Sequence, residues 1–316
     1  MGKTIKIYLP TENVSGIRHA EITNWSGQAL ACPRSRFQEL REWPEVQRPG
    51  VYLLFGVDDE TGRDAVYIGE AEVVIDRLAS HVSNKRFWSE VVAFTSKDEN
   101  LTKGHVRYLE ARLIGMARHA NRYHLTNSAF PPVPLLPRSE RDAMEEYLVS
   151  VKMLLGSLGF KVLDPLLTQS PKFPITQPAT NPDSVGQDEK TDNAKDFDSS
   201  PVFHLRVAEI HAQAVSTDEG MVVLEGSEAS ASTYKSITGS MLAIRQNLIE
   251  SGALIPFGAK MRLTRNHLFK SASQAGGVLA GYSINGREYW RLDDGTTYAQ
   301  HEAKVAESVL QGLENS

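Results

Sequence analysis

Six polar side chains in this sequence are of the types that phosphodiester hydrolysis uses. Two tyrosines lie in short apolar segments, VYLLFG and AVYIG, and an arginine and a histidine follow in EVVIDRLASH. A glutamate and an asparagine come later; in chain order the set is Tyr52, Tyr67, Arg77, His81, Glu110 and Asn127. Adjacent antiparallel strands can place both tyrosines on one face of a sheet, and residues four apart share one side of a helix. We therefore expect the first four side chains to lie close together.

An arginine and a tyrosine supply two of the functions that a phosphodiester requires. Arg77 would hold the scissile phosphate and stabilise charge that builds in the transition state. A tyrosine would take a proton from water, but with a reference pKa near 10 only about one in a thousand is ionised at neutral pH. Tyr52 therefore needs a neighbouring cation or hydrogen-bond donor to lower its pKa. Tyr67 and His81 could supply hydrogen bonds to the base, the water or the phosphate.

The glutamate is unusual because its neighbours on the helix are apolar. Glu110 lies between Val106 and Leu113, and a carboxylate on an apolar face is costly unless it is paired or bound to a cation. A divalent cation there would neutralise the non-bridging and leaving oxygens of the substrate. Because only one carboxylate belongs to the set, we expect a single metal. An ion pair of Glu110 with Arg107 or Arg112 remains the alternative.

Each of these residues also has an ordinary explanation when it is taken alone. Tyrosines are good strand formers, and an asparagine in a loop often fixes a turn. A lone histidine or arginine is more often structural or solvated than catalytic. Only the joint order of all six favours chemistry. A structural zinc site is not expected, since the chain has one cysteine, Cys32, and no tight histidine spacing.

The elements that must position these residues are short strands and helices. Residues 49–165 alternate apolar segments with helical patterns, which predicts an α/β (α+β) domain with a small, mainly antiparallel sheet flanked by helices. The segments 51–56 and 65–69 form a hairpin. The remaining expected elements are a helix at 72–82, a strand at 90–96, helices at 103–121 and 139–159 with Ser139 as the cap of the second, and a strand at 159–164.

Composition divides the rest of the chain into three parts. Residues 1–48 predict a β-rich extension, with period-two alternation in IKIYL. Residues 166–200 are rich in Pro, Asp, Ser, Thr and Asn, and too poor in apolar residues to offset the entropy of ordering, so we expect a flexible acidic linker. Residues 201–316 resume apolar patterns and predict a separate C-terminal α+β domain, in which GREYWRL is expected to be a strand.

Bulk properties limit the cellular setting. The 316 residues carry a net charge of −5, which does not favour nucleic-acid binding over the whole surface but allows a local basic strip. One cysteine permits no internal disulfide and indicates a reducing compartment, so we expect a cytoplasmic protein. The first residues, MGKTIKIYLP, lack the apolar core of a signal peptide, and no apolar run approaches membrane-spanning length, so no membrane association is expected.

The quoted segments resemble a known family. GVY at 50–52 followed by YIG at 67–69 resembles the signature of the GIY-YIG endonuclease superfamily, and the arginine, histidine, glutamate and asparagine follow in that family's order. The resemblance implies that Tyr52 is the general base, Arg77 the phosphate binder and Glu110 the ligand of Mg²⁺, with Mn²⁺ as the alternative cation. It also implies catalytic roles for Tyr67, His81 and Asn127, and backbone roles for Gly50 and Gly69. We expect Gly69 to serve the strand-to-helix turn near the phosphate.

The resemblance extends to the C-terminal part. FWSEVVAFTSKDENLTKGHVRYLEARLI is similar to one bacterial subgroup of that superfamily, whose members carry a C-terminal domain of unknown role. The stretch from GSEASASTYKS to REYWRLDDGTTY looks like that domain, which is DUF4357-like. The expected activity is therefore a Mg²⁺-dependent endonuclease acting most readily on DNA, with RNA left open. A catalytically weak nucleic-acid-binding or protein-interaction protein on the same scaffold is the alternative.

A basic strip in the C-terminal part could hold the substrate. KMRLTRNHLFK contains four cations and no acid: Lys260, Arg262, Arg265 and Lys270. Such a strip could contact phosphates, although an ordinary solvated edge explains it equally well. Acidic residues slightly outnumber basic ones in residues 49–165, so a separate DNA-holding domain is attractive. A protein partner of the C-terminal domain and a homodimer both stay open.

Overall fold

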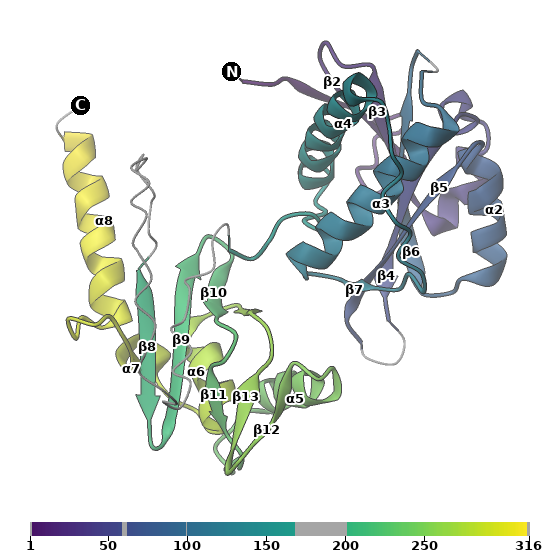
Figure 1. Ribbon diagram of the computed structural model, residues 1–316. Helices are drawn as coiled ribbons and strands as arrows, with labels where there is room; N and C mark the ends of the chain where they lie inside the picture. Colours follow the sequence, from purple (N-terminus) through teal and green to yellow (C-terminus); the bar gives the residue numbers. More distant parts are fainter. Residues whose placement is uncertain (1, 59–61, 99, 168–200, 315–316) are drawn as a thin grey trace, which may run out of the picture. The chain divides into compact units, whose positions relative to one another are not determined.

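The computed structural model describes residues 2–58, 62–98, 100–167 and 201–314. The chain divides into two compact units, Met1–Leu166 and Leu167–Ser316, and both mix helices with sheets (Figure 1). The predicted linker, 166–200, lies outside the described residues apart from its first two positions. Among the described helices, none combines the length and the apolar character needed to cross a membrane.

The first unit is built on one seven-stranded sheet with the order β1-β2-β3-β6-β4-β5-β7. All neighbouring strands are antiparallel except β5 and β7, which are parallel. The expected mainly antiparallel sheet is therefore present. Its strands are β1 (Ile5–Tyr8), β2 (Arg18–Ile22), β3 (Gly27–Pro33), β4 (Gly50–Val57), β5 (Asp64–Ala71), β6 (Trp88–Ser96) and β7 (His124–Leu125).

Helices cover both faces of this sheet. The short segments η1 (Arg34–Arg36), α1 (Phe37–Leu40) and η2 (Pro44–Val46) precede three longer helices, α2 (Val74–Asn84), α3 (Lys103–Ala120) and α4 (Arg138–Ser157). In β4, Val51 and Leu53 face the core under α3 and α4, whereas Tyr52 and Leu54 face the core under α2. Because both faces are covered, β4 is apolar at almost every position, which is why its sequence shows no alternation.

The strands before residue 49 continue the same sheet. β3 pairs with β6 from Gly27↔Ser96 to Pro33↔Glu90, and every residue of β3 except Pro33 is buried. The N-terminal β-rich region is thus joined to the central strands by a long backbone ladder.

The end of the first unit differs from expectation in two places. α4 begins one residue before Ser139, and Pro137 occupies the N-cap, where its fixed φ suits a helix start. Residues 159–164 form no strand: Gly159 turns the chain with φ 95°, and Val162 and Leu163 are buried in the core as loop residues. Their apolar character reflects packing against α4 rather than pairing in a sheet.

The second unit has two sheets and four helices within its described residues. A five-stranded sheet has the order β14-β10-β9-β8-β15, and a three-stranded sheet the order β11-β13-β12. The strands are β8 (Val202–Val207), β9 (Ile210–Thr217), β10 (Gly220–Val223), β11 (Glu228–Ser230), β12 (Leu254–Phe257), β13 (Lys260–Leu263), β14 (His267–Phe269) and β15 (Trp290–Arg291). The helices are α5 (Gly239–Glu250), α6 (Ala272–Ala280), α7 (Gly286–Tyr289) and α8 (Tyr298–Glu314).

The core of the second unit lies between the larger sheet and α6. Phe203, Leu205 and Trp290 from the sheet are fully buried, and so are Val278 and Leu279 of α6. The segment GREYWRL, expected to be a strand, forms the single helical turn α7 and only then the two-residue strand β15. Its apolar anchor is the Trp290 side chain, whose Nε1 donates to the carbonyl of Ala272.

Candidate active site

The strand register brings the two tyrosines to one face of the sheet. Tyr52 of β4 pairs with Gly69 of β5, and Leu54 pairs with Tyr67. Tyr67 is therefore the diagonal neighbour of Tyr52, two residues along the partner strand, where long side chains still meet. The two ring centroids are 6.4 Å apart.

Both motif glycines make room for their neighbours. A Cβ at position 69 would lie 2.4 Å from the Tyr52 hydroxyl oxygen, so the tyrosine ring occupies the space that a side chain would fill. This corrects the expectation that Gly69 serves the turn before the helix, because it lies inside β5. A Cβ at Gly50 would lie 2.2 Å from the carbonyl oxygen of Phe94, so this glycine permits the close approach of β4 and β6.

The histidine contacts both phenols from α2. The Tyr52 hydroxyl lies 2.7 Å from Nε2 of His81, and the His81 ring also stands edge-on to Tyr67 with centroids 5.2 Å apart. His81 is buried, with 5% of its surface exposed. Burial, reinforced by the charges of Arg77 and Lys85, lowers the pKa of His81 to about 4. The imidazole is thus neutral at neutral pH, and in its Nδ1–H tautomer Nε2 accepts a hydrogen bond from the Tyr52 hydroxyl.

The two phenols lie at different depths. Tyr52 has no exposed surface, whereas Tyr67 is half-buried. Burial, and then the charge of Tyr67, raises the pKa of Tyr52, while hydrogen bonding and charge from Arg77 act against that rise. Burial and the charge of Glu110 raise the pKa of Tyr67, and Arg77 again acts in the opposite direction. Tyr52 and His81 form the floor of the site, and Tyr67 lies nearer to solvent.

Two cations border the phenols. Arg77 is exposed on α2. Its hydrogen bond to Tyr52, and then the charge of Tyr52, raises the pKa of the Arg77 guanidinium. The Lys85 ammonium lies 4.0 Å from the centroid of the Tyr67 ring. Burial and the neighbouring Arg77 lower the pKa of Lys85. An anion at this rim would therefore meet one exposed guanidinium and one partly buried ammonium.

The predicted metal-binding glutamate is electrostatically coupled to this group. Burial, and then the charge of Glu70, raises the pKa of Glu110 to about 7, while Arg77 and Arg107 act to lower it. The Glu110 carboxylate also accepts a hydrogen bond from the backbone N–H of Glu70, and its charge contributes to the raised pKa of both Tyr52 and Tyr67. Glu110 therefore lies close enough to the phenols and to Arg77 for their charges to interact.

The ordinary ion pairs considered for this glutamate do not form among the described residues. Arg112 Nη2 is 2.8 Å from Oε2 of Glu145, and Arg107 Nε is 3.8 Å from Oε1 of Glu70. Both candidate partners of Glu110 thus pair with other carboxylates. A half-buried carboxyl group without an ion pair stays protonated more readily, which agrees with its raised pKa.

Glu70 and Lys85 were missed by sequence reasoning, and Arg107 was considered only as an ion-pair partner of Glu110. Glu70 follows Gly69, and strand alternation turns its side chain toward α3, the helix that carries Glu110. Arg107 precedes Glu110 by three residues, and Lys85 follows His81 by four, both about one helical turn. This spacing was the available signal, but the sequence alone did not show that β5 and α3 are adjacent.

The donor atoms present suit Mg²⁺ better than zinc. Among the described residues no group of three or more His, Cys, Asp and Glu side chains is arranged to hold a metal ion. Mg²⁺ usually keeps several waters and is held in proteins by one or two carboxylates, and Glu110 with Glu70 provides such a set. A zinc site would need three or four protein ligands, and nitrogen or sulfur donors are typical.

Asn127 serves the backbone of β5. Its Nδ2 donates to the carbonyl of Ile68 at 2.8 Å, and its Oδ1 accepts from the Ile68 amide at 3.0 Å. Both ends of the amide are thus engaged by the residue that lies between Tyr67 and Gly69. In this arrangement Asn127 positions the strand that carries Tyr67, and its catalytic role stays a prediction.

The four cations of the proposed basic strip come from different elements of the second unit. Lys260 is paired with Glu228 at 2.9 Å, and the Arg262 guanidinium lies 3.1 Å from the centroid of the Phe257 ring. Both residues belong to β13, in the three-stranded sheet. Arg265 lies in the loop after β13, and Lys270 is exposed just beyond β14, which belongs to the five-stranded sheet.

Comparison with known proteins informs only the second unit. No curated protein and no solved structure matches the chain. Residues 203–302 match the family model described as "Domain of unknown function (DUF4357)", which confirms the C-terminal part of the resemblance noted from the sequence.

Proposed function

We propose that this protein is a Mg²⁺-dependent endonuclease of the GIY-YIG type that hydrolyses phosphodiester bonds, with DNA as the expected substrate. The observation that carries the proposal is the contact of the Tyr52 hydroxyl with Nε2 of His81, beneath an exposed Arg77 and within the electrostatic range of Glu110. A phenol, a neutral imidazole, a guanidinium and a carboxylate that interact in this way match the chemical demands of phosphodiester hydrolysis.

Arg77 has the properties of the phosphate binder. It is exposed, always charged, and able to form two parallel hydrogen bonds with phosphate oxygens. Lys85 lies beside the neighbouring Tyr67 ring and adds a second positive charge. Together they would attract the scissile phosphate to the rim and stabilise the charge that develops on it during attack by water.

Proton transfer can proceed without a phenolate in the resting enzyme. Burial raises the pKa of Tyr52, so its hydroxyl is protonated at neutral pH. As the phenol oxygen accepts a proton from the attacking water, its own proton can pass to Nε2 of His81, 2.7 Å away. The new P–O bond forms from the water oxygen and the proton ends on the imidazole. The bond to the leaving oxygen breaks with its electron pair on that oxygen, and the resulting alkoxide takes a proton from solvent. Tyr67, which is half-buried, would orient the water.

Glu110 and Glu70 would hold the cation. When bound, Mg²⁺ would supply charge neutralisation at the non-bridging and leaving oxygens. The raised pKa of Glu110 fits this role, because a neighbouring cation would favour the ionised carboxylate that burial and Glu70 disfavour.

Cleavage assays test the proposal directly. Purified full-length protein is incubated with duplex, branched and single-stranded DNA and with RNA, in Mg²⁺, in Mn²⁺ and in chelator. We expect cleavage that needs the cation and that falls at least about 100-fold in Glu110→Gln, as expected when a residue of the reaction centre is lost. Glu146→Gln, an exposed glutamate on α4, is the matched control and also tests for a contaminating nuclease. Undiminished cleavage by Glu110→Gln would overturn the mechanism.

The complete burial of Tyr52 favours one alternative. A base without exposed surface is reached by water only if the site opens, so the scaffold could instead bind nucleic acid without cutting it. Binding without cleavage across the divalent cations, with wild-type protein and every substrate, would favour this second function.

A further inference from the structure

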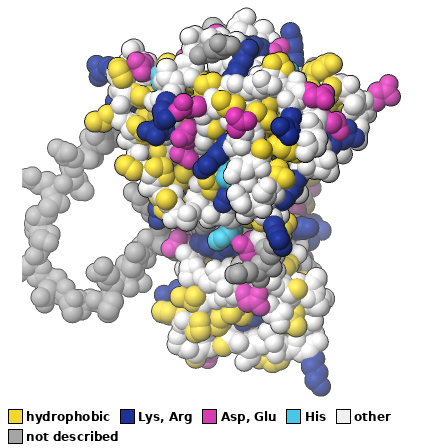
Figure 2. Space-filling model, turned by 90° about the vertical axis from the view of Figure 1, so that its right-hand side faces the viewer, with side chains coloured by type: hydrophobic (Ala, Val, Ile, Leu, Met, Phe, Trp, Pro, Cys, Tyr) yellow, Lys and Arg dark blue, Asp and Glu magenta, His cyan; other side chains and the backbone are white. Residues whose placement is uncertain are grey.

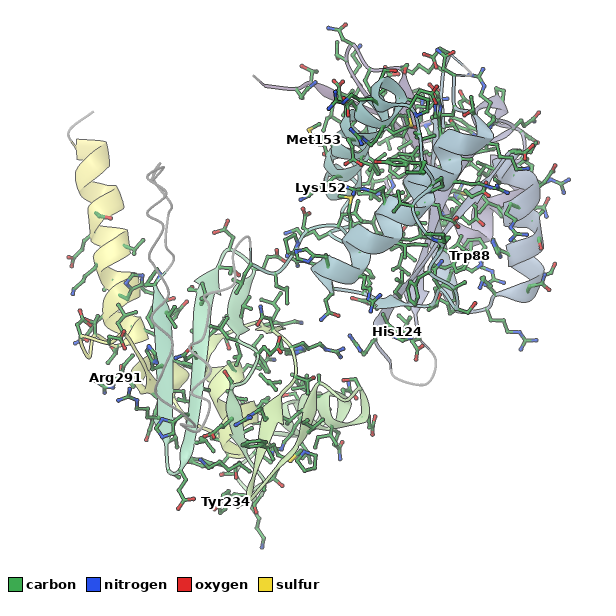
Figure 3. The ribbon with its side chains drawn as sticks, in the orientation of Figure 1. Trp88, His124, Lys152, Met153, Tyr234 and Arg291 are labelled. Atoms are coloured by element: carbon green, nitrogen blue, oxygen red, sulfur yellow. The ribbon has the colours of Figure 1, made fainter. Side chains whose placement is uncertain are left out.

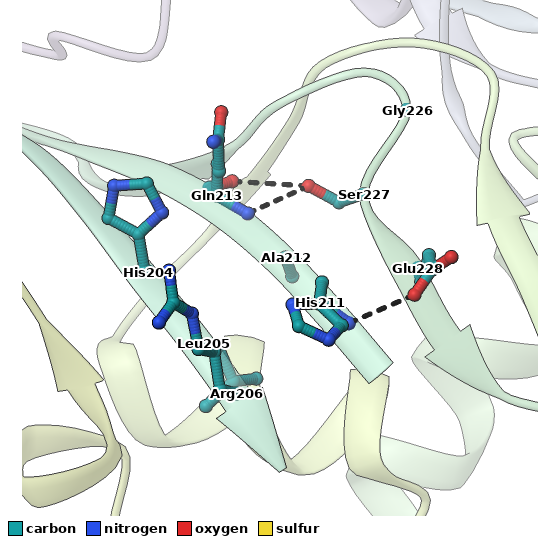
Figure 4. A pocket seen from close by; sticks show the side chains of 9 residues that line it. All are labelled: His204, Leu205, Arg206, His211, Ala212, Gln213, Gly226, Ser227 and Glu228. Carbon is teal, nitrogen blue, oxygen red and sulfur yellow. Dashed lines mark hydrogen bonds between the residues drawn. The ribbon is translucent and has the colours of Figure 1, made fainter. Parts of the chain in front are cut away.

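One face of the larger sheet in the second unit is polar and basic. The register aligns Arg291 of β15 with His204 of β8, and His204 with Gln213 of β9. In the neighbouring rank Arg206 of β8 pairs with His211 of β9. Successive side chains alternate between the faces of a strand, so these five share one face; Figure 4 labels all of them except Arg291. We call Arg291, His204, Gln213, Arg206 and His211 the outer face.

The opposite side of the same strands builds the core. Leu205 and Trp290, which pair with one another, are fully buried, and Ala212 next to them is 3% exposed. The sheet is thus anchored on its inner side, and the outer face is presented by a rigid support. Rigid positioning matters for recognition, because less side-chain and backbone freedom is lost on binding.

Two cavities flank β8 on this face. One has a volume of about 310 Å³ and is bordered by His211, Ser227 and Glu228 (Figure 4). The other has a volume of about 570 Å³ and is bordered by Tyr289 and by Arg291, which Figure 3 labels. His204 and Arg206 line both cavities, so the two form one groove that crosses the strand. Neither cavity is lined mainly by apolar side chains, which distinguishes the groove from a typical pocket for an apolar ligand.

The guanidinium groups on this groove are available for an anion. Among the described residues Arg206 forms no ion pair, and Arg291 donates only to the carbonyl of Gly295, at 3.2 Å. Two of the acids nearby are engaged: Oε2 of Glu228 is 2.9 Å from the Lys260 ammonium, and Oδ1 of Asp293 is 3.1 Å from Nε2 of His204. A third acid, Glu288, also lines the larger cavity. Arg206 is also exposed.

We propose that the outer face binds the phosphate backbone of a single strand of nucleic acid, with Arg206 and Arg291 each contacting a phosphate. The choice of ligand rests on the proposed function of the first unit, but the binding itself needs no catalysis. Surfaces that bind single strands combine a positive groove with aromatic rings on which bases stack. Tyr289, 47% exposed, lies beside Arg291 and supplies such a ring.

A single strand fits this groove better than a duplex. The two cavities lie between side chains on either side of β8. Each therefore has room for a nucleotide but not for a duplex. The charges are also few: Lys and Arg side chains elsewhere are interspersed with Asp and Glu rather than gathered in one field, as Figure 2 shows for one face of the molecule. A duplex binder depends on many phosphate contacts, whereas two contacts and a stacking ring suffice for a weak single-strand site.

The test measures binding in chelator, so that cleavage cannot interfere. Fluorescence anisotropy with a labelled oligothymidylate and with a duplex of the same length compares the full wild-type chain with Arg206→Ala/Arg291→Ala. We expect the variant to bind the single strand about 10- to 100-fold more weakly. The slope of log K against log salt should fall by about 1.4, since each lost phosphate contact removes about 0.7. Arg287→Ala, whose arginine is paired with Glu302 at 2.8 Å, is the matched control and should bind like wild type.

Two further variants test the positive charge and the aromatic ring separately. Arg206→Lys/Arg291→Lys should keep the salt dependence. Tyr289→Leu should weaken binding by about 5- to 160-fold with the slope unchanged, since stacking is worth about 1–3 kcal/mol per base. Unaltered single-strand binding in Arg206→Ala/Arg291→Ala would overturn the proposal. Equal loss of duplex and single-strand binding would overturn the assignment to single strands. If wild type binds the single strand as described but cuts nothing, the nuclease proposal fails while the binding proposal stands. If wild type cuts but Arg206→Ala/Arg291→Ala binds the single strand as well as wild type does, the binding proposal fails while the nuclease proposal stands.

Discussion

The hydroxyl of Tyr52 on β4 lies 2.7 Å from Nε2 of His81 on α2, and neither side chain has appreciable contact with solvent. The contact couples the residue expected to be the base to a neutral proton acceptor. It also joins the sheet to the helix that carries Arg77. Removing either partner should therefore affect chemistry and stability in separable ways.

Replacing the two phenols should distinguish their roles. Tyr52→Phe keeps the ring that fills the space above Gly69 but removes the hydroxyl that contacts His81. We expect single-turnover cleavage to fall by about 100-fold or more, as for loss of a general base, with only a small change in melting temperature. Tyr67→Phe should lose less. A larger loss in Tyr67→Phe than in Tyr52→Phe would transfer the role of base to Tyr67.

His81 should make the fold less stable in acid. Its folded-state pKa of about 4 lies below the ordinary 6.5, so the unfolded chain binds the proton first as the pH falls. The stability contributed by the neutral ring is present above pH 6.5 and is lost between pH 6.5 and 4, amounting to no more than about 3 kcal/mol. Urea unfolding across this range should show a shallower dependence in His81→Gln. The exposed His119→Gln is the control, and a wild-type-like slope in His81→Gln would contradict the prediction.

Glu110 should show the opposite pH dependence. Its folded-state pKa of about 7 is raised, so the native state holds the proton more tightly, and the associated stability is present at low pH and lost as the pH rises through 7. Glu110→Gln should therefore be more stable than wild type at pH 8, by about 1–2 kcal/mol after screening of this half-buried group, and nearly equal at pH 5.

Mg²⁺ should reverse the difference in stability between wild type and Glu110→Gln at pH 8. A cation that binds only the folded protein raises its melting temperature, and the effect should appear at pH 8 in wild type but not in Glu110→Gln. Because the carboxylate must be ionised to bind metal, the Mg²⁺ concentration needed for half of the effect should increase below pH 7. Thermal scans over a Mg²⁺ series measure both. Equal stabilisation of the two proteins would show that the cation binds elsewhere.

Adding one methyl group at Gly69 should damage the site. The new Cβ would meet the Tyr52 hydroxyl oxygen at 2.4 Å, so the ring or the strand must shift, which typically costs about 1–3 kcal/mol. Cleavage should fall together with the melting temperature. Gly115→Ala provides the matched control, because a Cβ at position 115 meets nothing within 4 Å. The substitution also replaces a glycine within the helix α3 by a better helix former. That variant should gain about 0.5–1 kcal/mol.

Asn127→Ala should loosen the edge of β5. It leaves both the amide and the carbonyl of Ile68 without their side-chain partner, which we expect to lower the free energy of unfolding by about 1–3 kcal/mol. Asn84→Ala, at an exposed position where the amide contacts only Ser80 Oγ, is the control. Thermal unfolding measures the difference. A fully stable Asn127→Ala that no longer cuts would instead indicate direct contact with the substrate.

Local patterns predicted the hairpin and the helix after it. The tyrosines fall in two apolar segments joined by a polar turn, and the four-residue spacing of Arg77 and His81 fixes their common side of α2. These features depend on neighbours along the chain. The register that makes Tyr67 the diagonal neighbour of Tyr52 follows from the same hairpin.

Other features depend on contacts between distant segments, which the sequence did not reveal. The role of Gly69 depends on the Tyr52 ring across the strand pair, and the involvement of Glu70 depends on α3 packing beside β5. Asn127 was expected in the catalytic set, whereas its partner is a backbone unit far along the chain. Residues 159–164 have the composition of a strand, but they pack as a loop in which Val162 and Leu163 are buried.

The ladder between β3 and β6 has a practical consequence for dividing the molecule. A fragment that begins at Pro49 would remove the neighbour of β6 along the whole run from Gly27 to Pro33 and leave Val91 and Val92 beside a bare row of amides and carbonyls. An uncovered apolar edge of this kind invites other chains to add to it, so such a fragment should precipitate or assemble. An autonomous first half must therefore start before Ile5, and its solubility on light scattering should depend on those opening strands as much as on the residues proposed for chemistry.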